Sequence, residues 1–80
     1  MSTQEAIVKR ISHLCEERGI SINRLANISG IPRSTVKNIF YGKSCNPGII
    51  TIKKICDGLE ICLADFFDTE ELRNLEQDIK

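Results

Sequence analysis

The chain has 80 residues, equal numbers of basic and acidic side chains, and 41% hydrophobic residues. This composition fits one small globular domain with a modest core and excludes a disordered chain. No apolar run is long enough to cross a bilayer, and the first residues lack the apolar segment of a signal peptide, so we expect a cytoplasmic protein.

The charges are distributed unevenly along the chain. Residues 1–54 hold nine of the eleven Lys and Arg residues against three acids, a net charge of +6, whereas residues 55–80 carry −6. An asymmetry of this kind indicates a basic working surface in the first part of the chain and an acidic remainder.

The first predicted helix starts close to the N-terminus. Ser2 and Glu5 have the spacing of a capping box, and Gly19 is expected to end the helix in the left-handed conformation. Between them, apolar residues recur at helical spacing, namely Ile7, Ile11, Leu14 and Cys15.

Two further helices are predicted around Gly30. Ser21 can cap a short helix before the glycine, and a helix over 32–41 follows it. Pro32 suits the first helical position, where its missing N–H costs nothing. At 100° per residue, the inward side of this helix is Val36, Ile39 and Phe40, while the outward side is Ser34, Lys37, Asn38 and Tyr41, with Arg33 at its border.

The last predicted helices are apolar on one side and lead into an acidic tail. Thr51 is expected to cap a fourth helix, whose apolar stripe is Ile52, Ile55, Cys56 and Leu59. A short fifth helix is expected over 63–67. We therefore divide the chain into a helical domain, 1–67, and an acidic tail, 68–80, that can itself be helical.

The four cysteines and the single histidine do not form a metal-binding or catalytic pattern. There is no C-x-x-C pair, and His13 has no second histidine, so no metal or cofactor is predicted. The thiols are interpreted as reduced and structural, with a redox-sensing Cys45 as the alternative. His13 also lacks a nucleophile partner and no phosphate-binding glycine loop is present, so we predict no catalytic residue and no enzyme.

The order of helix, short glycine-containing turn and helix over 21–41 is a helix-turn-helix arrangement. The stretches SINRLANISGIPRSTVKNIFYGKS and NPGIITIKKICDGLEICLADFF resemble the phage-repressor and Cro-like (XRE-type) helix-turn-helix DNA-binding family. The resemblance runs from about Ile11 to Phe67. It implies an all-α fold, a compact bundle of about five helices like the lambda-repressor DNA-binding domain, and a role as a sequence-specific transcriptional regulator or repressor.

The resemblance also implies a DNA-binding site. An α-helix fits the major groove, where arginine pairs with guanine and asparagine with adenine. The residues at the family's base-contacting positions are Arg33, Ser34, Lys37 and Asn38. Those at positions facing the sugar-phosphate backbone are Ser21, Asn23, Arg24, Tyr41, Lys43 and Ser44.

Three positions depart from the family pattern. Pro32 stands where a serine or threonine commonly caps the recognition helix, and Ile22 stands where many members carry a glutamine. Glu60 follows the fourth helix in place of a glycine. A left-handed Glu60 would cost on the order of 1 kcal/mol, so we expect this corner to be rebuilt.

The expected partners are double-stranded DNA and a second copy of the chain, without a small-molecule ligand or a membrane. The apolar residues available for a dimer contact are Leu63, Phe66, Phe67, Leu72, Leu75 and Ile79. A protein-interaction module with the same fold, such as an antitoxin or an adaptor, is the alternative function.

Overall fold

All regular structure in the residues that the computed structural model describes, 2–42 and 46–79, is helical. The helices are α1 (Thr3–Arg18), α2 (Ile22–Ser29), α3 (Arg33–Tyr41), α4 (Ile49–Leu59), α5 (Leu63–Phe67) and α6 (Glu70–Arg73). The predicted all-α class and its five helices are confirmed. The acidic tail adds the short α6, which Thr69 caps by accepting a hydrogen bond from the Leu72 amide at 3.2 Å.

Most helix ends follow the chemistry of their terminal residues. The Ser2 hydroxyl accepts from the Glu5 amide at 3.1 Å and the Glu5 carboxylate accepts from the Ser2 amide at 3.5 Å, which confirms the capping box. Gly19 ends α1 in the left-handed conformation, with φ of 60°. Glu60 takes the same conformation after α4, with φ of 58°, so the corner that was expected to be rebuilt is kept.

The predicted starts of α3 and α4 are wrong by one and by three residues. Pro32 has the extended backbone of an N-cap, so Arg33 is the first residue of α3. Thr51 is not the cap of α4, because Gly48 is the N-cap and Thr51 lies within the first turn. Because Gly48 has no side chain that could cap the helix, the sequence gives no capping signal at this start.

The core draws on every helix except α6. Leu25 and Val36 of the helix-turn-helix pair, and Phe66 of α5, have no or almost no exposed surface. The other buried hydrophobic residues are Ala6, Ile11, Leu14, Cys15, Ala26, Ile39, Ile52, Ile55, Cys56 and Leu59. The placement of Cys15 and Cys56 on apolar stripes is therefore confirmed. Phe66 is not available for a dimer contact, because it is fully buried in the core.

Two arginines of α1 join distant segments. The Arg10 guanidinium donates to the carbonyl oxygens of Phe66 at 2.7 Å and Asp65 at 2.9 Å. Arg18 donates to the Leu59 carbonyl oxygen at 2.9 Å. These bonds help to satisfy carbonyl groups in the last turns of α5 and α4, where the Asp65 carbonyl oxygen also accepts from the Asp68 amide at 3.3 Å.

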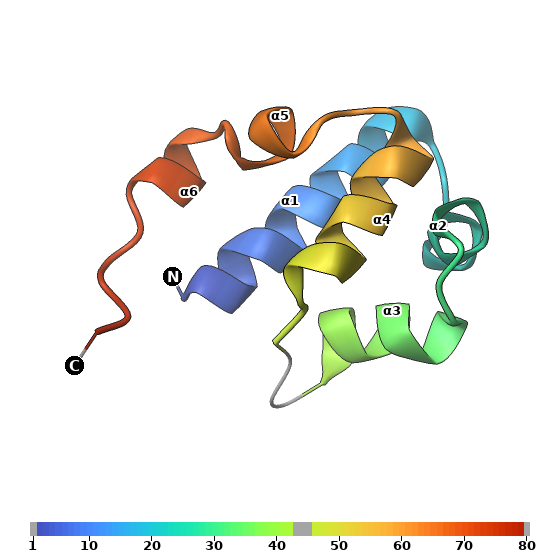
Figure 1. Ribbon diagram of the computed structural model, residues 1–80, viewed down its shortest axis with the longest axis horizontal. Coiled ribbons are helices and arrows are strands. Elements are labelled where there is room, and N and C mark those ends of the chain that lie inside the picture. The colour runs from blue at the N-terminus through green and yellow to red at the C-terminus, as the bar shows by residue number, and fades with distance from the viewer. Residues whose placement is uncertain (1, 43–45, 80) are drawn as a thin grey trace.

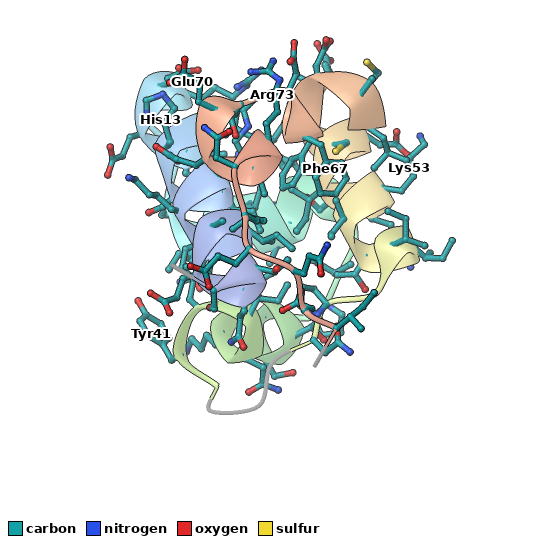
Figure 2. All side chains as sticks on the ribbon, turned by 90° about the vertical axis from the view of Figure 1, so that its left-hand side faces the viewer. His13, Tyr41, Lys53, Phe67, Glu70 and Arg73 are labelled. Carbon is teal, nitrogen blue, oxygen red and sulfur yellow. The ribbon has the colours of Figure 1, made fainter. Side chains whose placement is uncertain are left out.

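The helices are arranged so that α3 lies at one end of the molecule (Figure 1). The helices α5 and α6 lie at the opposite end, with α1 and α4 between them, and the perpendicular view agrees (Figure 2). The tail follows α1, where Lys9 pairs with Glu71 at 3.2 Å and the Thr3 hydroxyl donates to Asp78 at 2.7 Å. Among the described residues, each helix is too short or too polar to cross a membrane.

Candidate nucleic-acid interface

The helices α2 and α3 form one packed unit. Gly30, with φ of 66°, turns the chain between them, and its amide donates to carbonyl oxygens of the last turn of α2. The positive φ explains the glycine, because residues with a Cβ rarely adopt this conformation. Leu25 and Ala26 from α2 and Val36 from α3 are buried together in the core. The buried contacts therefore fix the orientation of α3.

The outward face of α3 is polar along its whole length. The four residues at the predicted base-contacting positions are exposed, as is Tyr41, which is 73% exposed and projects outward at that end of the molecule (Figure 2). Val36 and Ile39, on the other face, are buried. The exposed set is Arg33, Ser34, Lys37, Asn38 and Tyr41.

The first turn of α3 has free backbone amides that can bind an anion. Pro32 has no N–H, and no side chain caps this helix. The amides of Thr35 and Val36 donate to the Pro32 carbonyl oxygen at 3.0 and 3.3 Å. The amides of Arg33 and Ser34 precede this first bond, so they have no partner within the helix. Together with the positive end of the helix dipole, they favour a phosphate at this position.

The first turn of α2 presents the predicted backbone-contacting residues. Ser21, Asn23 and Arg24 are all exposed. The Ser21 hydroxyl oxygen caps α2 by accepting from the Arg24 amide at 3.1 Å, which leaves its own proton free to be donated. Of the other three members of that set, Tyr41 is exposed, and Lys43 and Ser44 lie outside the described residues, as does Cys45.

The basic residues of the first 54 positions do not form one surface. Arg10 and Arg18 bind backbone carbonyl groups, Lys9 pairs with Glu71, and Lys53 pairs with Asp57. Within the described part of the chain, Arg24, Arg33, Lys37 and Lys54 make no such hydrogen bond or ion pair. The basic side chains without such a partner therefore lie on α2, α3 and α4.

A hollow beside α3 was missed by the sequence analysis. It has a volume of about 270 Å³ and connects the second half of α3 with the segment that begins α4. Its lining residues are Thr35, Asn38, Ile39, Asn46, Pro47, Gly48 and Thr51. The start of α4 therefore flanks Asn38 of the exposed face. No sequence signal marks this hollow, because residues of two separate segments line it.

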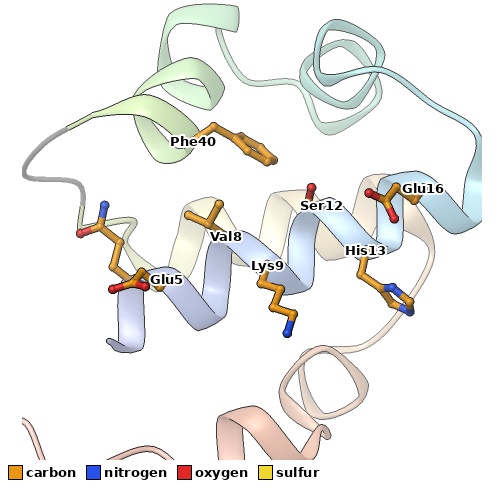
Figure 3. Close-up of a pocket in the computed structure, with 8 residues that line it drawn as sticks. Glu5, Val8, Lys9, Ser12, His13, Glu16 and Phe40 are labelled. Carbon is orange, nitrogen blue, oxygen red and sulfur yellow. The ribbon is translucent and has the colours of Figure 1, made fainter. Parts of the chain in front are cut away.

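A groove of about 440 Å³ lies between α1 and α3, on the inner side of α3 (Figure 3). Val8 and Phe40 supply its apolar surface. Ser12 points toward α3 while His13 points away from it, so these neighbours do not form a nucleophile and base. His13 pairs instead with Glu17, at 2.9 Å. Across residues 2–42 and 46–79, no three His, Cys, Asp or Glu side chains come together as metal ligands would.

The described thiols differ in their exposure. Burial raises the pKa of the Cys15 and Cys56 thiols above the ordinary value. Cys62 is exposed and caps α5, where its sulfur accepts from the Asp65 amide at 3.4 Å. The two buried thiols are therefore protonated and poorly reactive at neutral pH.

The fixed α2–α3 pair, with an exposed polar face on its second helix, is the arrangement of a helix-turn-helix DNA-binding domain. The chain belongs to the Cro/C1-type helix-turn-helix DNA-binding domain family, whose model matches residues 10–71.

Comparison with individual proteins gives the same family. The chain is 37% identical over 67 residues to the transcriptional regulator SlrR of Bacillus subtilis, covering 82% of this chain and 44% of that protein. It is 35% identical over 57 residues to the transcriptional repressor RghR of the same species, covering 71% and 42%. The chain thus spans less than half the length of these curated relatives. The crystal structure of the prophage Lp1 protein 11 is similar, with a TM-score of 0.82, 36% identity, and coverage of 94% of this chain and 100% of that one.

Proposed function

We propose that the chain binds double-stranded DNA at specific sequences, with α3 in the major groove, and thereby regulates transcription. The observation that carries this proposal is the exposed polar face of α3 on a helix-turn-helix scaffold whose buried residues fix its orientation. The relatives are named as transcriptional regulators, and RghR as a repressor, which favours repression by occupation of the operator.

The base-reading residues are assigned from their chemistry. Arg33, in the first turn of α3, carries the forked guanidinium that binds O6 and N7 of guanine, and Asn38 has the amide that matches adenine. Ser34 and Lys37 share this exposed face and can donate to base edges or to nearby phosphates.

The remaining exposed residues hold the sugar-phosphate backbone. Ser21, Asn23 and Arg24 at the start of α2 face one strand, and Tyr41 acts at the other end of α3. Lys43 and Ser44 extend that contact where the chain leaves the helix. Such contacts fix the register of α3 without carrying sequence information.

A charge-matched comparison tests the proposal. DNA selected from random duplexes by the parent is titrated with the parent, with Arg33→Ala/Lys37→Ala, and with Lys9→Ala/Arg73→Ala. Both variants lose two positive charges. The second pair lies on α1 and α6, where Lys9 and Arg73 make ion pairs with Glu71 and Asp68.

We expect the α3 variant to lose most of its specific affinity and the control to retain it. Parental affinity should also fall steeply as salt rises, because bound Lys and Arg release condensed counterions. Equal losses in the two variants, or binding that does not depend on salt, would contradict the proposal and favour the protein-interaction alternative.

A further inference from the structure

The groove between α1 and α3 has no role in the DNA contact proposed above. Its volume of about 440 Å³ lies within the range of pockets that bind small organic ligands. Val8 of α1 and Phe40 of α3 supply its apolar walls, and both are only half-buried where they pack against the core. A ligand that covers these walls removes apolar surface from water, which favours its binding.

One face of α1 borders this groove. Val8, Ser12 and Glu16 are spaced four residues apart, which places them in a row along one side of the helix. Figure 3 shows the Phe40 ring reaching from α3 toward this row, with Ser12 directed toward α3 and Glu16 on the same side of α1. The ion pairs among the described residues do not include Glu16.

The two basic residues at the groove are turned away from it and are already paired. Lys9 and His13 border the groove, but both point away from α3 (Figure 3). Lys9 pairs with Glu71 at 3.2 Å, and His13 pairs with Glu17 at 2.9 Å. Among the described residues, the groove therefore offers no unpaired cation to an anionic ligand.

The rim of the groove carries two carboxylates, Glu5 and Glu16. The Glu5 carboxylate accepts from the Ser2 amide in the capping box, whereas Glu16 is exposed. A ligand lying on Val8 and Phe40 covers part of the Glu16 carboxylate as well. Removing a carboxylate from water costs free energy unless the ligand replaces the lost hydrogen bonds. An ammonium group replaces them best, because its hydrogen bonds to a carboxylate are charge-assisted.

We propose that this groove binds a small organic amine with an apolar body. The ammonium group donates to the Glu16 carboxylate and the Ser12 hydroxyl oxygen, and the body lies against Val8 and Phe40. An aromatic body fits best, because contacts between rings add to the free energy of burial. No such ligand was predicted from the sequence, because the walls of the groove come from separate helices.

The bound amine is also coupled to α3, a step that rests on the function proposed above. It contacts α1 and Phe40 of α3 together, on the inner side of α3. A ligand that binds this arrangement of the two helices favours it over other arrangements. Because the same arrangement presents the polar face of α3 to DNA, the amine and the duplex strengthen each other's binding.

Three probes with the same indole body separate the charge from the apolar contact. Tryptamine carries an ammonium group, tryptophol a neutral hydroxyl and indole-3-acetate a carboxylate. Each is titrated near neutral pH into the full chain and followed by its amide NMR shifts, with the parent, Glu16→Gln and Glu17→Gln. Glu17→Gln is the charge-matched control, because Glu17 is the adjacent acid and pairs with His13, which points away from α3.

We expect tryptamine to shift the amides around Val8, Ser12 and Phe40 with a Kd of about 1 mM or tighter, as suits a ligand of its size. Tryptophol should bind about fivefold more weakly, and indole-3-acetate more weakly still. Glu16→Gln should lose about fivefold in affinity for tryptamine and none for tryptophol, whereas Glu17→Gln should match the parent. Equal affinity for the three probes, equal losses in the two variants, shifts confined to other parts of the chain, or no saturable shift with tryptamine would each overturn the inference.

The coupling to α3 is measured separately. Saturating tryptamine should raise the affinity of the parent for its selected duplex about fivefold and leave that of Glu16→Gln unchanged. A parental affinity that stays the same or falls would overturn the coupling. A parent that binds no duplex would contradict the proposed function, and the probe titration would still decide whether the groove binds amines.

Discussion

Gly58 lies directly against Ser29, at the contact between α4 and the end of α2. A Cβ atom on Gly58 would be 2.7 Å from the Ser29 hydroxyl oxygen and 2.9 Å from the Ile28 carbonyl oxygen. Both distances are too short for a real Cβ, so a glycine inside α4 allows the two helices to approach. This close packing of α4 on α2 also holds the helix-turn-helix unit against the core.

Gly58→Ala is therefore expected to destabilise the fold, although alanine is the better helix former by about 1 kcal/mol. Because the nearest backbone oxygen cannot move without α2, we expect a net loss of about 1–3 kcal/mol in the free energy of unfolding, measured with urea. The double variant Ser29→Ala/Gly58→Ala should recover part of this loss. A gain in stability in the single variant would contradict the close approach.

The Ser29 hydroxyl itself gives a second prediction. It is buried and has no hydrogen-bond partner among the described residues. An unsatisfied buried polar group costs about 1–3 kcal/mol, so its removal should not weaken the fold. We expect the midpoint of thermal unfolding of Ser29→Ala to equal or exceed that of the parent. A clear fall in the midpoint would mean that the Ser29 hydroxyl makes a stabilising hydrogen bond, which would contradict the prediction.

The neighbours Arg10 and Lys9 show two different uses of a basic residue, one half-buried and one exposed. Its guanidinium donates to two carbonyl oxygens of α5 and lies 6.0 Å from the centre of the Phe66 ring. Lysine cannot reproduce this fork, so Arg10→Lys should lower the free energy of unfolding by about 1–3 kcal/mol. Lys9→Ala breaks only a half-exposed ion pair and should cost less than about 1 kcal/mol. Equal effects in urea denaturation would contradict the assigned role of Arg10.

The features predicted correctly from the sequence are those that neighbouring residues determine. The capping box at Ser2, the left-handed Gly19 and the inward stripe of α3 depend on neighbouring residues only, whereas the corner at Glu60 was expected to be rebuilt and is not. The start of α4 was missed because Gly48 caps without a side chain. The roles of Arg10 and Arg18 were missed because their carbonyl partners lie more than 40 residues away along the chain. Net charge by segment therefore overstated the extent of the DNA-facing surface.

The buried thiols give a pH-dependent prediction. Burial raises the pKa of Cys15 and Cys56 in the folded chain, so unfolding lets these thiols release protons more easily. Their contribution to stability is complete below the ordinary thiol pKa and is lost as pH rises through the raised one. In a Cys45→Ser background, a thiol reagent near neutral pH should modify Cys62 quickly and the buried pair only after unfolding. Rapid modification of all three thiols would contradict the burial.

The last prediction separates reading the bases from holding the backbone. Arg33→Ala removes a bidentate donor to one base pair, so it should cost about 1–3 kcal/mol on the selected duplex and much less on random DNA. Arg24→Ala, at the start of α2, should weaken binding to both duplexes alike and reduce the salt dependence by about one unit per site. Both side chains are exposed, so neither variant should change the unfolding midpoint. If Arg33→Ala and Arg24→Ala lower specific and random binding in the same proportion, α3 does not read the sequence.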